Sequence, residues 1–284
     1  MRSLAGMALV VALLGCGGPT PTATPSPAPT TTPAPTFWLV QVGGRTQAID
    51  CRGSGKPTVV LDGGLGVYSG TWVGVLDALA NESFRVCRYD RPGLGESEAG
   101  PKPRTSERFV TELRALLEAA GERPPYVLVG HSLGGLNVQL FACELRDEVA
   151  GVVFVDAIHP DLDERIEPLL TPAQVAQRRE ELELNEEGIR FEDILASEDQ
   201  VRAAPEFPAV PIVAIAHGVH FTVTDPDWPE QPVEDLWAEL QRDLSRLAPG
   251  GKLVIATKSQ HRIQETEPEV VAAAIREVVT GSGT

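Results

Sequence analysis

The sequence predicts an α/β fold, a mostly parallel eight-stranded sheet flanked by helices. After an antiparallel start, runs of apolar and β-branched residues alternate with stretches whose apolar residues recur at helical spacing. The expected strands cover residues 37–42, 46–51, 58–61, 84–89, 126–129, 151–156, 211–216 and 252–256. One of these strands runs directly into a helix through a turn of glycines and a serine, which is typical of a parallel sheet that carries a site at its edge.

The N-terminal residues predict an export signal rather than part of the fold. Arg2 precedes an apolar run, Leu4 to Leu14, that is too short to remain as a membrane span. Residues 1–15 therefore predict a signal peptide. Leu13-Leu14-Gly15-Cys16 resembles a bacterial lipobox, which implies cleavage before Cys16 and lipid attachment to its thiol. An ordinary secretory signal with a chance cysteine is the alternative, and either interpretation exports the chain.

Composition and charge limit the partners and the domain count. Acids outnumber bases by 40 to 24, and the net charge of −16 would repel the phosphates of nucleic acids. Residues 16–36 combine the lipidated cysteine with a Pro/Thr-rich stretch that cannot bury apolar surface, so we expect a spacer there. One domain then covers residues 37–281, held at the extracytoplasmic side of the cell envelope by its lipid. Nothing in the sequence implies a protein partner.

Two cysteines lie on strands that are expected to be neighbours. Residues on either side of Gly43-Gly44 predict a β-hairpin, whose second strand ends at Cys51. Cys87 lies in the fourth expected strand. Because export permits oxidation, we predict a Cys51–Cys87 disulfide. Cys143 is expected to be buried as a small apolar residue.

Helical patterns fill most gaps between the strands. They are expected over residues 72–81, 105–121, 136–145 and 233–247, and in a last stretch that begins at Pro268. Thr105 is the expected N-cap of the second helix, because its hydroxyl could accept from the first free N–H groups.

Residues 159–208 differ from the rest of the chain. Charged residues dominate them, and apolar residues are sparse. We predict a helical cap insertion over the carboxyl edge of the sheet, where it would form the roof of a substrate pocket. A solvated helical decoration without substrate contact is the alternative.

Gly130-His131-Ser132-Leu133-Gly134-Gly135 is the motif around which the chain is organised. A strand that turns sharply into a helix needs small residues two positions on either side of the apex, and glycines occupy both positions. Ser132 lies at the apex, so its exposed hydroxyl is the candidate nucleophile. The alternative is a glycine-rich turn with a solvated serine.

A second glycine-rich segment, Asp62-Gly63-Gly64-Leu65-Gly66, follows the third expected strand. Glycines at this edge let backbone N–H groups approach a ligand closely. We expect the N–H of Gly64 or Leu65, together with that of Leu133, to stabilise a developing oxyanion. A simple tight turn is the alternative. The segment lacks the Lys-Ser/Thr pair of a phosphate-binding loop, which disfavours nucleotide binding.

A serine nucleophile requires a base, and histidine suits that role near neutral pH. Of five histidines, His131 adjoins Ser132 and His159 lies in the insertion. His217 and His220 follow the seventh strand, where they could line the pocket. Only His261 lies between the last strand and the last helix, at the edge where Ser132 is expected.

These motifs together resemble the α/β-hydrolase family, across residues 37–281. The resemblance rests on the Gly63–Gly66 loop, on Tyr89-Asp90-Arg91-Pro92-Gly93-Leu94-Gly95-Glu96-Ser97, on Gly130–Gly135 and on the late histidine. It implies Ser132 as the nucleophile and His261 as the base, in the family order serine, acid, histidine.

The acid is where this sequence departs from the family. The family usually places it shortly after the seventh strand, but His217-Gly218-Val219-His220-Phe221 contains no carboxylate. Asp156 closes the sixth strand, a position that some members use, and we favour it by its expected geometry. Asp225 or Asp227 is the alternative, and an Asp156 that only caps a turn is also consistent with the sequence.

The predicted activity is that of a serine hydrolase that cleaves a small-molecule ester through an acyl-enzyme. No cofactor is needed, and the histidines and cysteines lack the spacing of zinc ligands. A dehalogenase or an epoxide hydrolase of this fold would need a carboxylate at position 132. The alternatives are other serine chemistry on amides, C–C bonds or peroxyacids, and a non-catalytic surface lipoprotein.

Overall fold

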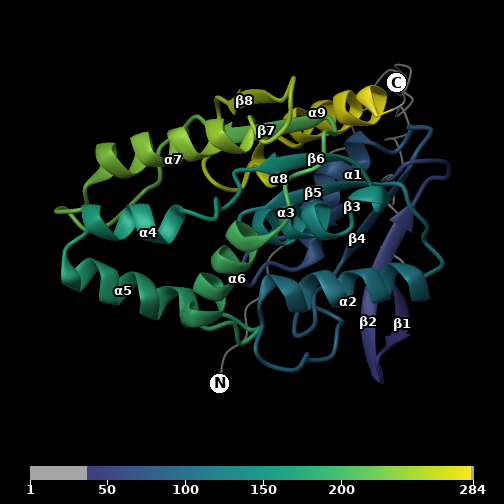
Figure 1. The fold of residues 1–284 in the computed structure, drawn as a ribbon, viewed down its shortest axis with the longest axis horizontal. Coiled ribbons are helices and arrows are strands. Elements are labelled where there is room, and N and C mark those ends of the chain that lie inside the picture. Colours follow the sequence, from purple (N-terminus) through teal and green to yellow (C-terminus); the bar gives the residue numbers. More distant parts are fainter. Residues whose placement is uncertain (1–36, 283–284) are drawn as a thin grey trace, which may run out of the picture. The chain divides into compact units, whose positions relative to one another are not determined.

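A computed structural model describes residues 37–282 (Figure 1). The predicted signal peptide, the lipid attachment at Cys16 and the whole spacer lie outside the described residues, and they stay predictions. No helix within residues 37–282 combines the length and the apolar character needed to cross a bilayer.

Eight strands form one sheet in the order β1-β2-β4-β3-β5-β6-β7-β8. The strands are β1 (Trp38–Val42), β2 (Arg45–Arg52), β3 (Thr58–Asp62), β4 (Arg85–Tyr89), β5 (Tyr126–His131), β6 (Val149–Val155), β7 (Ile212–His217) and β8 (Lys252–Ala256). The first hairpin, β1 and β2, pairs antiparallel, and all pairs from β4 to β8 are parallel. The predicted fold class is therefore confirmed.

Most of the helices connect successive parallel strands, and the last two follow the last strand. They are α1 (Val73–Ala78), α2 (Ser106–Ala119), α3 (Gly134–Glu144), α4 (Leu162–Ile166), α5 (Pro172–Glu183), α6 (Phe191–Ala203), α7 (Glu230–Leu244), α8 (Ile263–Thr266) and α9 (Pro268–Gly281). The first is shorter than predicted, because it begins only after a 3₁₀ turn over Ser69–Trp72 and already ends at Ala78. The third begins earlier than predicted, directly after the serine turn.

The sheet has a buried core on each face. Side chains alternate along a strand, so Val60 of β3 belongs to one apolar cluster, whereas its neighbours Val59 and Leu61 belong to the other. The first cluster packs under α2, α3 and α7, and the second under α1 and α9. Because both faces are covered, the central strands are continuous apolar runs, as the sequence predicted.

Three helices, α4, α5 and α6, occupy the connection between β6 and β7 and lie to one side of the sheet (Figure 1). Helix α6 also caps α2. Thr105 occupies the N-cap position of α2, but its hydroxyl makes no capping bond. The free N–H groups of Ser106 and Glu107 instead donate to the side chains of Ser197 (2.9 Å) and Gln200 (3.0 Å) in α6. Thr105 is therefore the N-cap residue of α2, as predicted, but a helix distant in sequence satisfies the donors that its hydroxyl was expected to bind.

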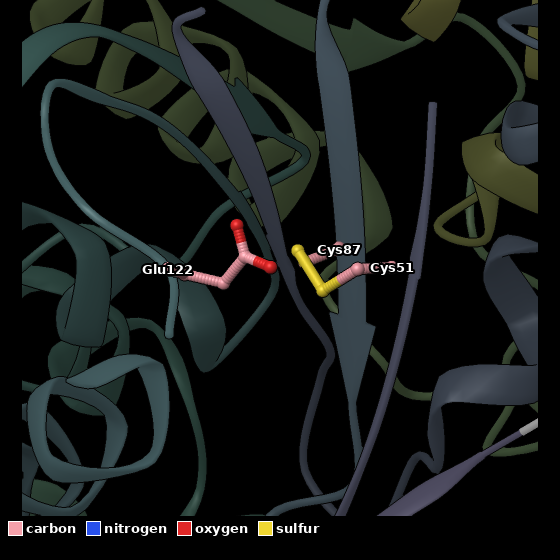
Figure 2. Close-up of side chains that lie close together, drawn as sticks. All are labelled: Cys51, Cys87 and Glu122. Atoms are coloured by element: carbon pink, nitrogen blue, oxygen red, sulfur yellow. A yellow bond between two sulfur atoms is a disulfide. The ribbon is translucent and has the colours of Figure 1, made fainter. Parts of the chain in front are cut away.

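Cys51 and Cys87 face each other across the antiparallel pair of β2 and β4 and form a disulfide (Figure 2). The predicted pairing is confirmed. The Glu122 carboxylate lies beside the two sulfurs, and it forms an ion pair with Arg85 at 2.7 Å. Within residues 37–282 these three side chains form the only cluster close enough together to hold a metal ion. The two cysteines cannot act as thiolate ligands, because they form the disulfide. Cys143 is buried, as predicted.

Removal of the disulfide is expected to lower the free energy of unfolding by about 2–4 kcal/mol, because it closes a loop across 36 positions of the chain. Chemical denaturation of the Cys51→Ala/Cys87→Ala variant measures this loss. Wild-type protein unfolded with a reductant should lose a similar amount, whereas the double variant should not respond to the reductant. Equal stability of the oxidised wild type and the double variant would contradict the expectation.

Candidate active site

Ser132 lies at the turn between β5 and α3 with a positive φ of 52°, a conformation that is rare for a residue with a side chain. The turn is held by a backbone bond from Gly135 N–H to the carbonyl of Ser132 (2.9 Å). A Cβ at Gly134 would lie 2.6 Å from the carbonyl oxygen of Asp62, so no larger residue fits there. The turn therefore depends on the small residue that the sequence provides.

The loop after β3 passes directly against the serine. A Cβ at Gly64 would lie 3.1 Å from Ser132 Cβ and 3.0 Å from His131 Nδ1. Within residues 37–282 the backbone N–H groups of Leu65 and Leu133 make no hydrogen bond. Both N–H groups are therefore without an acceptor in this part of the chain.

Arg91 forms hydrogen bonds to the backbone of this loop. Its buried guanidinium donates to the carbonyl oxygens of Gly63 and Gly64, to Asp62 Oδ1 (2.7 Å) and to both oxygens of Glu187 (2.7 Å each). In a trans peptide the N–H points opposite to the carbonyl, so the N–H groups that follow these two carbonyls point away from Arg91.

Glu187 belongs to the connection between α5 and α6 and also accepts from the N–H of Gly66 (2.9 Å). The insertion is thereby bonded to the glycine-rich loop. Burial raises the pKa of Asp62 above its ordinary value, although Arg91 acts in the opposite direction. The loop conformation thus rests on one cluster of buried charges.

Asp156 directly follows β6 with a positive φ of 45°, and its carboxylate is fully buried. Its Oδ2 lies 2.8 Å from Nδ1 of His261 in the loop between β8 and α8. Trp237 of α7 donates its Nε1–H to Oδ1 at 2.8 Å. The acid favoured from the sequence is thus bonded to the predicted base.

A second histidine that the sequence did not assign to the site also contacts Asp156. His217 Nδ1 lies 3.0 Å from Oδ1 and 2.8 Å from Oδ2, and its backbone N–H donates to Oδ1 at 3.1 Å. Burial alone would raise the pKa of Asp156, but the hydrogen bonds from His217 and His261 outweigh it and hold this pKa well below its usual range. The carboxylate is therefore charged at every pH at which the protein would be assayed.

His131 fixes the loop that carries His261. Its Nε2 lies 3.0 Å from the carbonyl oxygen of His261, and its Nδ1 lies 3.3 Å from Gln264 Nε2. Burial lowers the pKa of His131 to about 3, so the ring is neutral. A neutral ring that donates from Nε2 and accepts at Nδ1 satisfies both contacts.

Ser132 and His261 line the same cavity of about 520 Å³. Within residues 37–282 their side chains make no hydrogen bond to each other, and in ligand-free sites such bonds are often long and tighten when substrate binds. The walls carry apolar and aromatic residues together with polar ones from α5 and the β7–α7 connection. The apolar and aromatic ones are Ile158, Leu162, Leu182, Phe221, Val223, Trp228 and Trp237.

The insertion contributes directly to this cavity, through Leu162 of α4 and through five residues of α5. The five are Gln174, Gln177, Arg178, Glu181 and Leu182. This arrangement supports the cap interpretation over a decoration without access to the site.

Two buried carboxyl groups lie inside the cap, Asp163 in α4 and Glu198 in α6. The backbone N–H of Asp163 donates to Glu198 Oε1 at 3.2 Å, and Arg178 binds Asp163 Oδ1. Burial, reinforced by the nearby charge of Asp163, raises the pKa of Glu198 far above its ordinary value. Glu198 is therefore protonated at neutral pH.

The alternative acids occupy another part of the cavity wall. Asp225 lines the cavity, but its carboxylate accepts from Gln174 Nε2 (2.7 Å) and from the N–H of Asp227 (2.9 Å). Within the described residues, no histidine is bonded to Asp225 or Asp227. The sequence left open that His217 and His220 line the pocket. In the structure they line a separate cavity of about 190 Å³, and neither lines the cavity of Ser132.

Known proteins are similar to this chain in sequence. Residues 57–209 match the family described as alpha/beta hydrolase fold. The uncharacterized protein YqjL of Bacillus subtilis is 28% identical over 227 residues, which cover 80% of this chain and 85% of that protein.

Solved structures share the same architecture. A thermophilic esterase from Thermogutta terrifontis superposes with a TM-score of 0.57 at 23% identity, over 88% of this chain and 100% of that one. The enol-lactonase from Burkholderia xenovorans LB400 gives a TM-score of 0.56 at 19% identity, over 84% of this chain and 98% of that one. At these identities the superpositions concern the fold alone. The sequence match over more than half of the chain, and the fold that agrees with it, identify this protein as a member of the α/β-hydrolase family.

Proposed function

We propose that this protein hydrolyses carboxylic esters, with Ser132 as the nucleophile, His261 as the general base and Asp156 as the acid that orients it. The observation that carries the proposal is the 2.8 Å bond from His261 Nδ1 to the buried Asp156 carboxylate, made at the wall of the cavity that Ser132 also lines. This bond leaves Nε2 of His261 as the nitrogen that accepts a proton.

The reaction proceeds in two halves. Ser132 Oγ attacks the ester carbonyl carbon while His261 Nε2 takes the hydroxyl proton, and a tetrahedral intermediate forms. Its oxyanion accepts from the N–H groups of Leu133 and of Leu65 or Gly64, which Arg91 orients through the carbonyls behind them. The C–O bond to the alcohol then breaks, and His261 returns the proton to the departing oxygen.

Water completes the cycle. It attacks the acyl-enzyme carbonyl and gives a proton to His261. The Ser132–acyl bond then breaks to release the carboxylic acid, and His261 returns the proton to Ser132 Oγ. Throughout, Asp156 accepts from Nδ1–H of His261 and stabilises the imidazolium that forms twice per turnover. The apolar and aromatic walls of the cavity suit an apolar acyl or alcohol group.

Ser132→Ala is expected to abolish covalent labelling by a fluorophosphonate probe and to lower ester turnover by at least about 10⁴-fold, because the nucleophile is removed. Labelling is followed by gel fluorescence and by mass spectrometry of the peptide that contains residue 132. Ser69→Ala, which removes another buried serine hydroxyl, is the matched control and should label as the wild type does.

A panel of p-nitrophenyl esters and the matching anilides separates esterase from amidase chemistry. We expect turnover of the esters and little of the anilides. A wild-type protein that the probe does not label, or a Ser132→Ala variant with full ester turnover, would refute the proposal.

A further inference from the structure

Asp156 contacts two histidines, His217 and His261, and only His261 lines the cavity that contains Ser132. His217 is the last residue of β7, and its Nδ1 reaches both carboxylate oxygens of Asp156, at 3.0 and 2.8 Å. It occupies the stretch where the family resemblance implied the acid itself. Here a histidine stands in that place and contacts an acid supplied by the neighbouring strand.

The other ring nitrogen of His217 also meets a carboxylate. Nε2 lies 2.8 Å from Glu234 Oε2 in α7, and Glu234 Oε1 accepts the N–H of Phe221 at 2.9 Å. An oxygen of a carboxylate accepts and does not donate, so both ring nitrogens must carry a hydrogen. Burial alone would lower the pKa of His217, but its bonds to Asp156 and Glu234 outweigh burial and raise this pKa to about 9.

We propose that His217, held as an imidazolium between Asp156 and Glu234, is a positioning residue that fixes the Asp156 carboxylate and offsets part of its charge at His261. The proposal rests on the proposed function, since it concerns the acid of the same triad. Its physical content is electrostatic. A cation on one side of Asp156 weakens the attraction that this carboxylate exerts on a proton at His261 on the other side.

The surroundings of His217 contain few other charges. Asp156 at the end of β6, Glu234 of α7 and His261 of the β8–α8 loop lie nearest, with the Trp237 and Phe221 rings packed between them. The 190 Å³ cavity behind the ring is lined in addition by His220, Asp235 and Arg242. Asp235 and Arg242 carry opposite charges, so Glu234 and Asp156 dominate the field at His217.

The consequence is a pH dependence that a purely structural histidine would not produce. Without the cation, Asp156 acts on His261 at full strength, and His261 takes up a proton more readily. A protonated His261 cannot accept the proton of Ser132. The acidic limb of the activity profile should therefore move to higher pH when His217 loses its charge.

The test uses the full chain and the rate of fluorophosphonate labelling at Ser132 between pH 5 and 9. In His217→Asn the amide can still donate to Asp156 but carries no charge. We expect its acidic limb to lie about one pH unit above that of the wild type. In Glu234→Gln, which removes a negative charge while His217 keeps its bonds to Asp156, we expect a smaller shift in the opposite direction, to lower pH. His220→Asn, an equal change at an exposed histidine bonded to Glu230, should leave the profile unchanged.

The outcomes separate this inference from the proposed function. Absence of labelling in the wild type would refute the nucleophile itself. Labelling with the same acidic limb in wild type, His217→Asn and Glu234→Gln would overturn the role of His217 and leave the triad standing.

Nitrogen NMR of the wild type provides a measurement that needs no variant. The two ring nitrogens of His217 should give the signature of a doubly protonated imidazole at pH 7. A neutral His217 ring at that pH would overturn the inference even if His217→Asn failed to fold.

Discussion

Asparagine in place of Asp156 is expected to lower kcat about 10⁴-fold. The amide can present its N–H₂ to His261 Nδ1, which favours the ring form with hydrogen on Nε2 and leaves no acceptor for the Ser132 proton. The change also removes the negative charge that stabilises the imidazolium formed in the reaction. Steady-state kinetics on a p-nitrophenyl ester, with thermal unfolding to verify the fold, measures the effect.

The matched control is Asp225→Asn, the same substitution on a carboxylate that lines the same cavity. Because Asp225 binds Gln174 and the backbone of Asp227 rather than a histidine, its loss should change kcat by no more than a few-fold. Near-normal turnover in Asp156→Asn together with a large loss in Asp225→Asn would transfer the role to the later acid.

Replacement of the buried Arg91 by Met is expected to destabilise the fold strongly. It removes the cationic partner of the buried Asp62 and Glu187 carboxyls and a donor to two backbone carbonyls, and the loss of one partner from a buried ion pair costs about 3–5 kcal/mol. The free N–H groups of the glycine-rich loop also lose their orientation, so kcat should fall about 10²–10³-fold in the molecules that remain folded.

Urea unfolding and ester kinetics on Arg91→Met measure the two effects separately. Arg114→Met is the control, since Arg114 forms an exposed pair with Glu148 and its loss should cost less than about 1 kcal/mol. Arg91→Lys keeps a cation and tests the site if the Met variant does not fold. It should be more stable than Arg91→Met but still impaired in kcat. Arg91 variants as stable and as active as the Arg114 control would contradict this role.

The sequence predicted the fold because its signals are local. Continuous apolar strands, glycines around Ser132 and helical spacing each occupy a short window, and the structure agrees with them. The acid was harder to choose. Asp156 closes a strand, whereas Asp225 and Asp227 lie in a later loop, and no local pattern shows which of them meets a histidine. In the structure Asp156 binds two histidines, and Asp225 binds Gln174 and the N–H of Asp227.

The partners of Asp156 could not be read from the sequence for a related reason. His217 reaches it because β6 and β7 are adjacent in the sheet, and Glu234 meets His217 because α7 packs with one particular rotation. Both facts depend on the arrangement of whole elements, which local patterns do not encode. The same holds for Thr105, whose expected capping bond is replaced by side chains about 90 positions later.

The protonated Glu198 beside Asp163 has a consequence for the thermodynamics of the whole chain. An isolated glutamate is ionised at neutral pH, so folding of the cap takes up a proton at Glu198. The raised folded-state pKa means that this contribution to stability is complete below the unfolded-state pKa and declines as the pH rises towards the folded-state value. Over that interval each pH unit removes about 1.4 kcal/mol per proton, so the contribution of Glu198 to the free energy of unfolding shrinks steadily as the pH rises from acidic towards mildly alkaline values.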